Sequence, residues 1–87
     1  MAHNRDSDDV IVSGRKIRRQ RVLAGMSLRA MSKACARAGS PVSFGNLGKI
    51  ERGLQDPHPR VLKVIATVLE VETEELLEDD KPAAVAS

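Results

Sequence analysis

Residues 43–53 of the chain read SFGNLGKIERG. On a helical wheel at about 100° per residue, Leu47 and Ile50 mark one apolar side. Glu51 lies only about 40° from Leu47 on that wheel, so its carboxylate must reach the edge of the core. A partly buried carboxylate needs a cationic partner, and Arg21, on the inner side of an upstream helix, is the obvious candidate. The sequence therefore predicts a structural ion pair between Arg21 and Glu51.

The opposite side of this wheel combines small and cationic residues, with an aromatic ring and an amide beside them. Its members are Gly45, Gly48, Lys49 and Arg52, flanked by Phe44 and Asn46. A glycine inside a helix costs about 0.5–1 kcal/mol relative to alanine. Two glycines on one outer face suggest that another surface, such as a DNA backbone, approaches closely. The alternative is that both glycines lie on a solvated face and serve no contact.

Helical periodicity extends to both sides of this stretch, with breakers at regular intervals, and predicts an all-α fold of five helices. The predicted helices span residues 13–25, 27–39, 43–53, 59–70 and 73–78. Ile17 and Ala24 mark the inner side of the first helix. Ser27 and Ser43 are placed to cap the second and third helices, each after an apolar residue suited to a hydrophobic staple. Two stapled helices joined by a turn are typical of a helix-turn-helix, here about 27–53.

The charge distribution divides the 87-residue chain, whose net charge is only +2. Residues 1–60 carry 12 basic and 5 acidic side chains, whereas residues 61–87 carry 2 basic and 7 acidic ones. A basic body with an acidic end favours a polyanionic partner at one surface. We expect a flexible arm over 1–12, one domain over 13–78 and an acidic flexible tail over 79–87. The apolar run 10–12 should pack on the body rather than form a strand.

Several classes of protein are disfavoured by the same sequence. Its longest apolar run is four residues, which predicts no membrane span, and its polar start is unlike a signal peptide, which predicts a cytoplasmic protein. Cys35 is the only cysteine, so it has no intrachain disulfide partner and is best read as a small core residue. No spacing among Cys35, His3 and His58 resembles a metal site, and no catalytic set can be assembled. We expect no enzyme activity, no metal and no cofactor.

The ordered set of motifs resembles the Cro/repressor helix-turn-helix family, also called XRE-type or lambda-repressor-like domains, over about residues 13–77. The residues that carry the resemblance are Ile17, Arg21, Gly25-Met26-Ser27, Leu47, Ile50-Glu51-Arg52-Gly53, Pro57, Leu62, Ile65-Ala66, Leu69, Val71 and Leu76-Leu77. The resemblance implies a compact five-helix domain that binds double-stranded DNA. It also implies that the third helix enters the major groove and that many relatives bind two half-sites as dimers.

The resemblance assigns DNA contacts to individual positions. The base-facing segment corresponds to Ser43, Phe44, Gly45, Asn46 and Lys49, and the phosphate-contacting positions correspond to Ser27 and Arg52. Arg29 and Lys33 are further phosphate candidates, because the second helix crosses the DNA backbone in this motif. Phe44 would touch a thymine methyl, Asn46 would read adenine and Lys49 would read guanine. Because so few long polar side chains are available to contact base edges, part of the specificity would come from DNA shape.

The sequence departs from the family pattern in the helix-turn-helix itself. Leu28 stands where many members have a glutamine that contacts phosphate, and the stretch 35–42 is longer than the usual turn. The extra residues must either lengthen the second helix or enlarge the connection.

These observations favour a sequence-specific double-stranded DNA-binding transcriptional regulator, a homodimeric repressor acting by steric occlusion. Candidate dimer contacts are Leu76 with Leu77, unless they simply close the core, or Val22 with Leu23. The alternative is an antitoxin or bridging module whose main partner is another protein. An RNA-binding function is weaker, because Phe44 is the only aromatic residue available to stack on bases.

Overall fold

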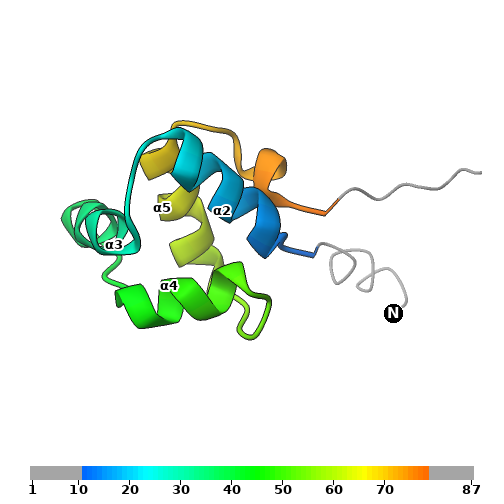
Figure 1. The fold of residues 1–87 in the computed structure, drawn as a ribbon, viewed down its shortest axis with the longest axis horizontal. Coiled ribbons are helices and arrows are strands. Elements are labelled where there is room, and N and C mark those ends of the chain that lie inside the picture. Colours follow the sequence, from blue (N-terminus) through cyan, green and yellow to red (C-terminus); the bar gives the residue numbers. More distant parts are fainter. Residues whose placement is uncertain (1–10, 79–87) are drawn as a thin grey trace, which may run out of the picture.

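The computed structural model describes residues 11–78, and within that range the regular structure is helical, as predicted (Figure 1). Its elements are α2 (Gly14–Leu23), α3 (Leu28–Arg37), α4 (Phe44–Glu51), α5 (Pro59–Leu69) and the 3₁₀ helix η1 (Thr73–Leu76). The expected fifth helix is thus a single 3₁₀ turn. It is short because the chain is already extended at Leu77. The proposed arm up to residue 10 and the tail from residue 79 lie outside the described residues.

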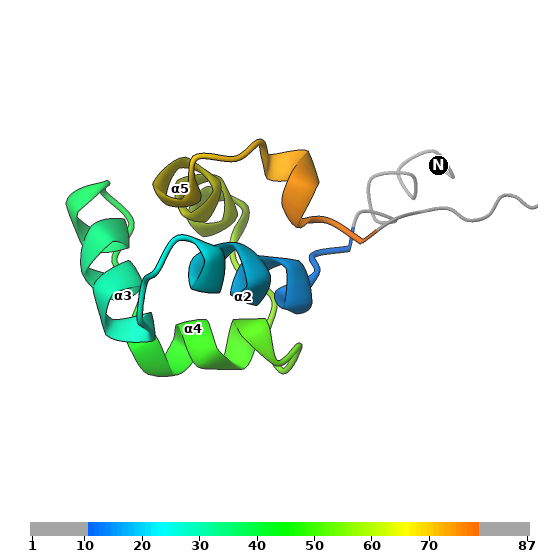
Figure 2. The same cartoon turned by 45° about the horizontal axis from the view of Figure 1, so that its top comes forward.

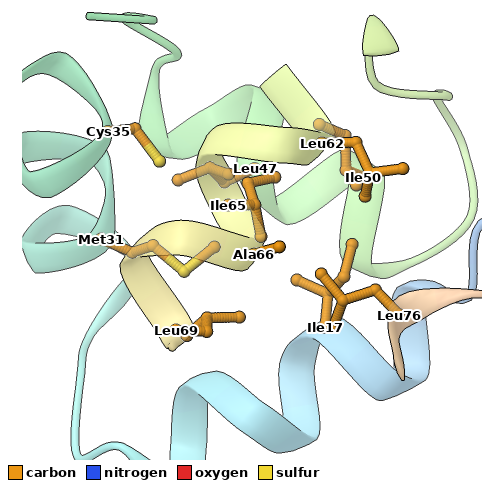
Figure 3. Close-up of a cluster of buried hydrophobic side chains, with 10 residues drawn as sticks. All are labelled: Ile17, Met31, Cys35, Leu47, Ile50, Leu62, Ile65, Ala66, Leu69 and Leu76. Carbon is orange, nitrogen blue, oxygen red and sulfur yellow. The ribbon is translucent and has the colours of Figure 1, made fainter. Parts of the chain in front are cut away.

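The core is a cluster of aliphatic and sulfur-containing side chains to which all five elements contribute (Figure 3). Its buried members are Ile17, Met31, Cys35, Leu47, Ile50, Leu62, Ile65, Ala66, Leu69 and Leu76. Leu76 is fully buried, so it closes the core and is not available as a dimer contact. Ala24 was predicted on the inner side of α2 but is exposed, because α2 ends at Leu23 and Ala24 is its C-cap.

Serine side chains begin three of the helices. The Oγ atoms of Ser13, Ser27 and Ser43 accept hydrogen bonds from the backbone N–H groups of Lys16, Ala30 and Asn46 at 3.2, 3.0 and 3.0 Å. The apolar residues before the last two caps, Met26 and Val42, are half-buried against the core. These contacts fix the angles at which the chain enters α3 and α4.

The two ends of the described chain lie side by side (Figures 1 and 2). Val12 forms an isolated antiparallel β-bridge with Leu77, and the Glu78 N–H donates to the Ile11 carbonyl oxygen at 2.7 Å. Val12 also packs on the core, as predicted for the apolar run 10–12, and Val10 lies outside the described residues. Lys16 Nζ donates to the Leu77 carbonyl oxygen at 2.8 Å and strengthens this closure.

Close contact between α2 and α4 depends on one small residue. α2 lies alongside α4 (Figure 2), and a Cβ on Gly14 would overlap the carbonyl oxygens of Ile50 and Glu51. The first turn of α2 therefore rests directly on the backbone at the C-terminal end of α4. No signal within either helix taken alone reveals this requirement for glycine.

Candidate nucleic-acid interface

The helices α3 and α4 meet through a connection that is hydrogen-bonded to α3. Gly39 adopts a positive φ of 100°, and the Ser40 N–H donates to the Cys35 carbonyl oxygen at 3.0 Å, which ends α3. The Ser32 hydroxyl then donates to the Val42 carbonyl oxygen at 2.6 Å. The long stretch noted in the sequence is thus divided, because its first three residues continue α3 and the rest belong to the connection.

An ion pair fixes the opposite end of α4. Arg21 Nε donates to Glu51 Oε2 at 2.6 Å, and a terminal guanidinium nitrogen donates to Oε1 at 2.9 Å. The other terminal nitrogen donates to the Met26 carbonyl oxygen at 2.8 Å. The Arg21 and Glu51 side chains are only 12 % and 4 % exposed. This bidentate arrangement attaches α2, the chain entering α3 and the last turn of α4 to one another.

The hydrogen bond that Arg21 donates to Glu51 is the main cause of a raised pKa for the guanidinium. Burial opposes this shift in pKa, and the negative charge of Glu51 reinforces it. Arg21 therefore stays charged, and its positive charge balances the negative charge of the buried Glu51 carboxylate.

The outer face of α4 is open along most of its length. Gly45, Asn46, Lys49 and Arg52 are exposed, and a Cβ at Gly45 would meet no atom closer than the Ser43 hydroxyl oxygen at 3.9 Å. Asn46 is at one edge of this face, beside a shallow groove that Pro57 and Val61 also line. A cationic side chain next to a bare stretch of helix is suited to close approach by a phosphate-lined groove.

Gly48 does not share this open face. It is half-buried, and a Cβ there would contact the Leu28 side chain at 3.6 Å. The prediction that Gly48 lies with Gly45 on the outer face is therefore wrong, because α3 crosses α4 on the side where Gly48 lies. Leu28, the departure from the family pattern, thus packs against α4.

A cation–π contact joins the first turns of α3 and α4. The Arg29 guanidinium carbon lies 4.4 Å from the centroid of the Phe44 ring, which is 43 % exposed. Phe44 was predicted to touch a thymine methyl and Arg29 to contact phosphate, but a contact between the two was not predicted. The signal that could have found the contact is their common position at the starts of the two helices of the motif.

The remaining predicted contact residues lie around this centre. Lys33 is exposed one turn after Arg29 on α3. Ser27 and Ser43 use their oxygens as cap acceptors, so each hydroxyl proton is still available to a phosphate oxygen. The structure therefore brings the starts of α3 and α4 and the outer face of α4 onto one continuous part of the molecule.

Among residues 11–78, no group of three or more histidine, cysteine or acidic side chains is arranged to hold a metal ion. No helix in that range is long and apolar enough to cross a membrane.

Comparison with known proteins identifies the motif. A family model described as helix-turn-helix matches residues 17–76, which is more than half of the chain. No curated protein and no solved structure gives a significant match. The matched region includes the Arg21–Glu51 pair, both helices of the motif and the core up to Leu76. The chain belongs to the Cro/repressor-type helix-turn-helix family of DNA-binding transcription regulators.

Proposed function

We propose that the chain is a sequence-specific, homodimeric repressor that acts in the cytoplasm by covering promoter DNA. The observation that carries the proposal is the exposed face of α4, where Lys49 lies beside the bare backbone of Gly45. The Arg21–Glu51 pair holds this helix rigidly against the body. A rigid helix with an open polar face is what base reading in the major groove requires.

Each side chain of the interface has a distinct task in this proposal. Lys49 reads guanine O6 and N7, and Asn46 reads adenine at the edge of the groove. Gly45 and the Ser43 cap allow the start of α4 to approach the base pairs closely. Phosphate contacts come from Ser27, Arg29, Lys33 and Arg52, and these fix the register without reading sequence. A dimer bound to two half-sites would then exclude RNA polymerase from the same DNA.

The direct test is a fluorescence-anisotropy titration of the full chain on duplexes from the DNA upstream of its own gene. A random duplex of equal length, at the same salt concentration, is the comparison, because phosphate contacts alone bind any DNA. We expect tighter binding to one upstream segment that contains an inverted repeat. Equal affinity for both duplexes would overturn sequence specificity. No affinity for either, together with a stoichiometric protein partner on purification, would favour an antitoxin or bridging module instead.

Lys49→Ala tests the placement of the recognition helix. Loss of a bidentate base contact should weaken specific binding by about 1–3 kcal/mol, while non-specific binding changes little. Lys63→Ala, which removes an exposed cation from α5, is the matched control and should leave the specificity ratio unchanged. If Lys49→Ala instead lowers both affinities equally, Lys49 is a phosphate contact and α4 lies differently on the DNA.

A further inference from the structure

The outward side of α2 carries an exposed apolar pair within a charged surface. Val22 and Leu23 are 55 % and 69 % exposed. They line a shallow groove together with the basic side chains of Arg15, Arg18 and Arg19, and Glu78 forms part of the same wall. This groove, called the α2 groove below, is separate from the open face of α4, because α2 meets α4 through other residues, among them Gly14 and Arg21.

The arginines of the α2 groove repel one another in the isolated subunit. Arg18 and Arg19 are three and four positions after Arg15, the spacings at which like charges on a helix destabilise it. Arg15 lies in the first turn of α2, which has no acidic residue, so the helix dipole also disfavours its charge. None of the three has an ion-pair or hydrogen-bond partner among residues 11–78. An acidic surface placed against the groove would relieve this repulsion.

Such an acidic surface is present on the neighbouring element of the same molecule. Glu74 and Glu78 are exposed at and after η1, which packs on α2 (Figure 2). Glu72 and Glu75 are also exposed but engage each other's backbone in a capping box, which leaves Glu74 and Glu78 available. Basic and acidic surfaces therefore lie next to one another around the exposed apolar pair.

We propose that a second copy of this chain binds the α2 groove. In a two-fold arrangement, the acidic end of each subunit, Glu74 and Glu78, faces the arginines of the other, and the Val22–Leu23 pairs meet near the axis. An isologous interface requires such a self-complementary patch. DNA fits the groove less well, because phosphates would leave the exposed Val22–Leu23 pair without an apolar partner. The inference rests on the proposed homodimer and assigns its surface.

Sedimentation velocity of the full chain without DNA, over a range of concentrations, tests the arrangement by charge reversal. We expect the wild type to dimerise. The variants Arg18→Glu/Arg19→Glu and Glu74→Lys/Glu78→Lys should each dimerise about 100-fold more weakly or worse, because like charges then face each other. An equimolar mixture of the two variants should recover dimers, because both contacts in the mixed pair are again between opposite charges. Arg37→Glu/Lys63→Glu reverses two exposed charges elsewhere and should dimerise like the wild type.

Three results would overturn the proposal: a wild type that is monomeric at every concentration, variants that dimerise normally, or variants that stay monomeric when mixed. Far-UV circular dichroism of each variant separates loss of the interface from loss of the fold. On a duplex holding a single half-site, the arginine variant should bind like the wild type. If it instead binds weakly and with a shallower salt dependence, the arginines contact phosphate and the groove is a DNA surface.

The same two assays keep this inference apart from the proposed function. Lys49→Ala should lose specificity while still forming dimers, and the α2-groove variants should lose dimers while keeping half-site binding. If only the dimerisation results fail, the proposal for DNA recognition by α4 still stands. If Lys49→Ala leaves specificity unchanged, the proposal for the α2 groove still stands.

Discussion

At the scale of single residues, the position of the recognition helix depends on one guanidinium group. Arg21 uses all three of its nitrogens, two on Glu51 and one on the Met26 carbonyl oxygen. Because both charged groups are largely removed from water, each would be costly to bury without the other. The pair thus links the geometry of α4 to the start of α3 as well as to α2.

Removing one member of this pair should destabilise the fold strongly. Glu51→Ala leaves the Arg21 charge uncompensated, and we expect a loss of about 3 kcal/mol or more in the free energy of unfolding, measured with urea. The double variant Arg21→Met/Glu51→Leu removes both charges and retains apolar volume, so it should be more stable than Glu51→Ala. A double variant no more stable than the single one would show that the hydrogen bonds, and not the charge balance, dominate.

The contact between Arg29 and Phe44 predicts coupled effects on DNA binding. If the ring positions the guanidinium, the losses of affinity in Phe44→Leu and Arg29→Ala should not add. The loss in the double variant should be smaller than the sum of the two single losses by about 0.5–1 kcal/mol. If Phe44 acts only on a thymine methyl, Phe44→Leu should cost the same affinity with or without Arg29. Anisotropy titrations of the four proteins on one duplex separate these two roles.

Much of the buried side of α4 could be predicted from sequence, because Leu47, Ile50 and Glu51 follow from the periodicity of one helix. The environments of Phe44 and Gly48 could not be predicted in this way. Both depend on how α3 crosses α4, and no periodicity within a single helix specifies a crossing angle.

At the scale of elements, two glycines in similar helical settings have opposite roles. Gly14 is required where the first turn of α2 meets the end of α4, whereas Gly45 faces open space. Helical periodicity indicated a role for Gly45 but not for Gly14, because the need for a small residue at Gly14 arises from the backbone of another helix. The ends of elements were likewise decided by context, since η1 stops where Leu77 pairs with Val12.

Alanine at these two positions should change stability in opposite directions. Gly14→Ala must displace the backbone at the end of α4, and we expect it to destabilise the protein by about 1–3 kcal/mol. Gly45→Ala should stabilise it by about 0.5–1 kcal/mol, because the added methyl group meets no atom closer than 3.9 Å and alanine favours helix. Thermal unfolding followed by circular dichroism measures both changes.

Gly45→Ala should at the same time weaken binding to specific DNA if the start of α4 approaches the groove closely. A more stable variant with undiminished affinity would show that this glycine merely lies on a solvated face.

At the scale of the whole molecule, Cys35 reports on the integrity of the core. Burial raises the pKa of its thiol above the ordinary value, and the side chain is inaccessible in the folded state. A thiol reagent should therefore react slowly with the native protein and at the rate of a free thiol in urea. Fast reaction of the native protein would show that the core opens readily.

The same shift predicts a loss of stability at alkaline pH. The folded state holds the thiol proton more tightly than the unfolded state. The stability that the protonated thiol contributes is therefore fully present below the ordinary thiol pKa, and it is lost as the pH rises through the pKa of the folded state. Cys35→Ala should be less stable overall but should lack this component of the pH dependence. Urea unfolding of both proteins across the alkaline range measures the difference.

The bridge between Val12 and Leu77 has a consequence for chain connectivity. It brings the first and last described segments together, and the turn 53–56 between α4 and α5 is exposed. The arrangement of the helices in space should therefore not depend on their order along the chain. A circular permutant in which a short linker joins residue 78 to residue 11, with new termini opened within 53–56, should retain the core and the α3–α4 geometry. The architecture would then be recovered from a sequence that begins with α5.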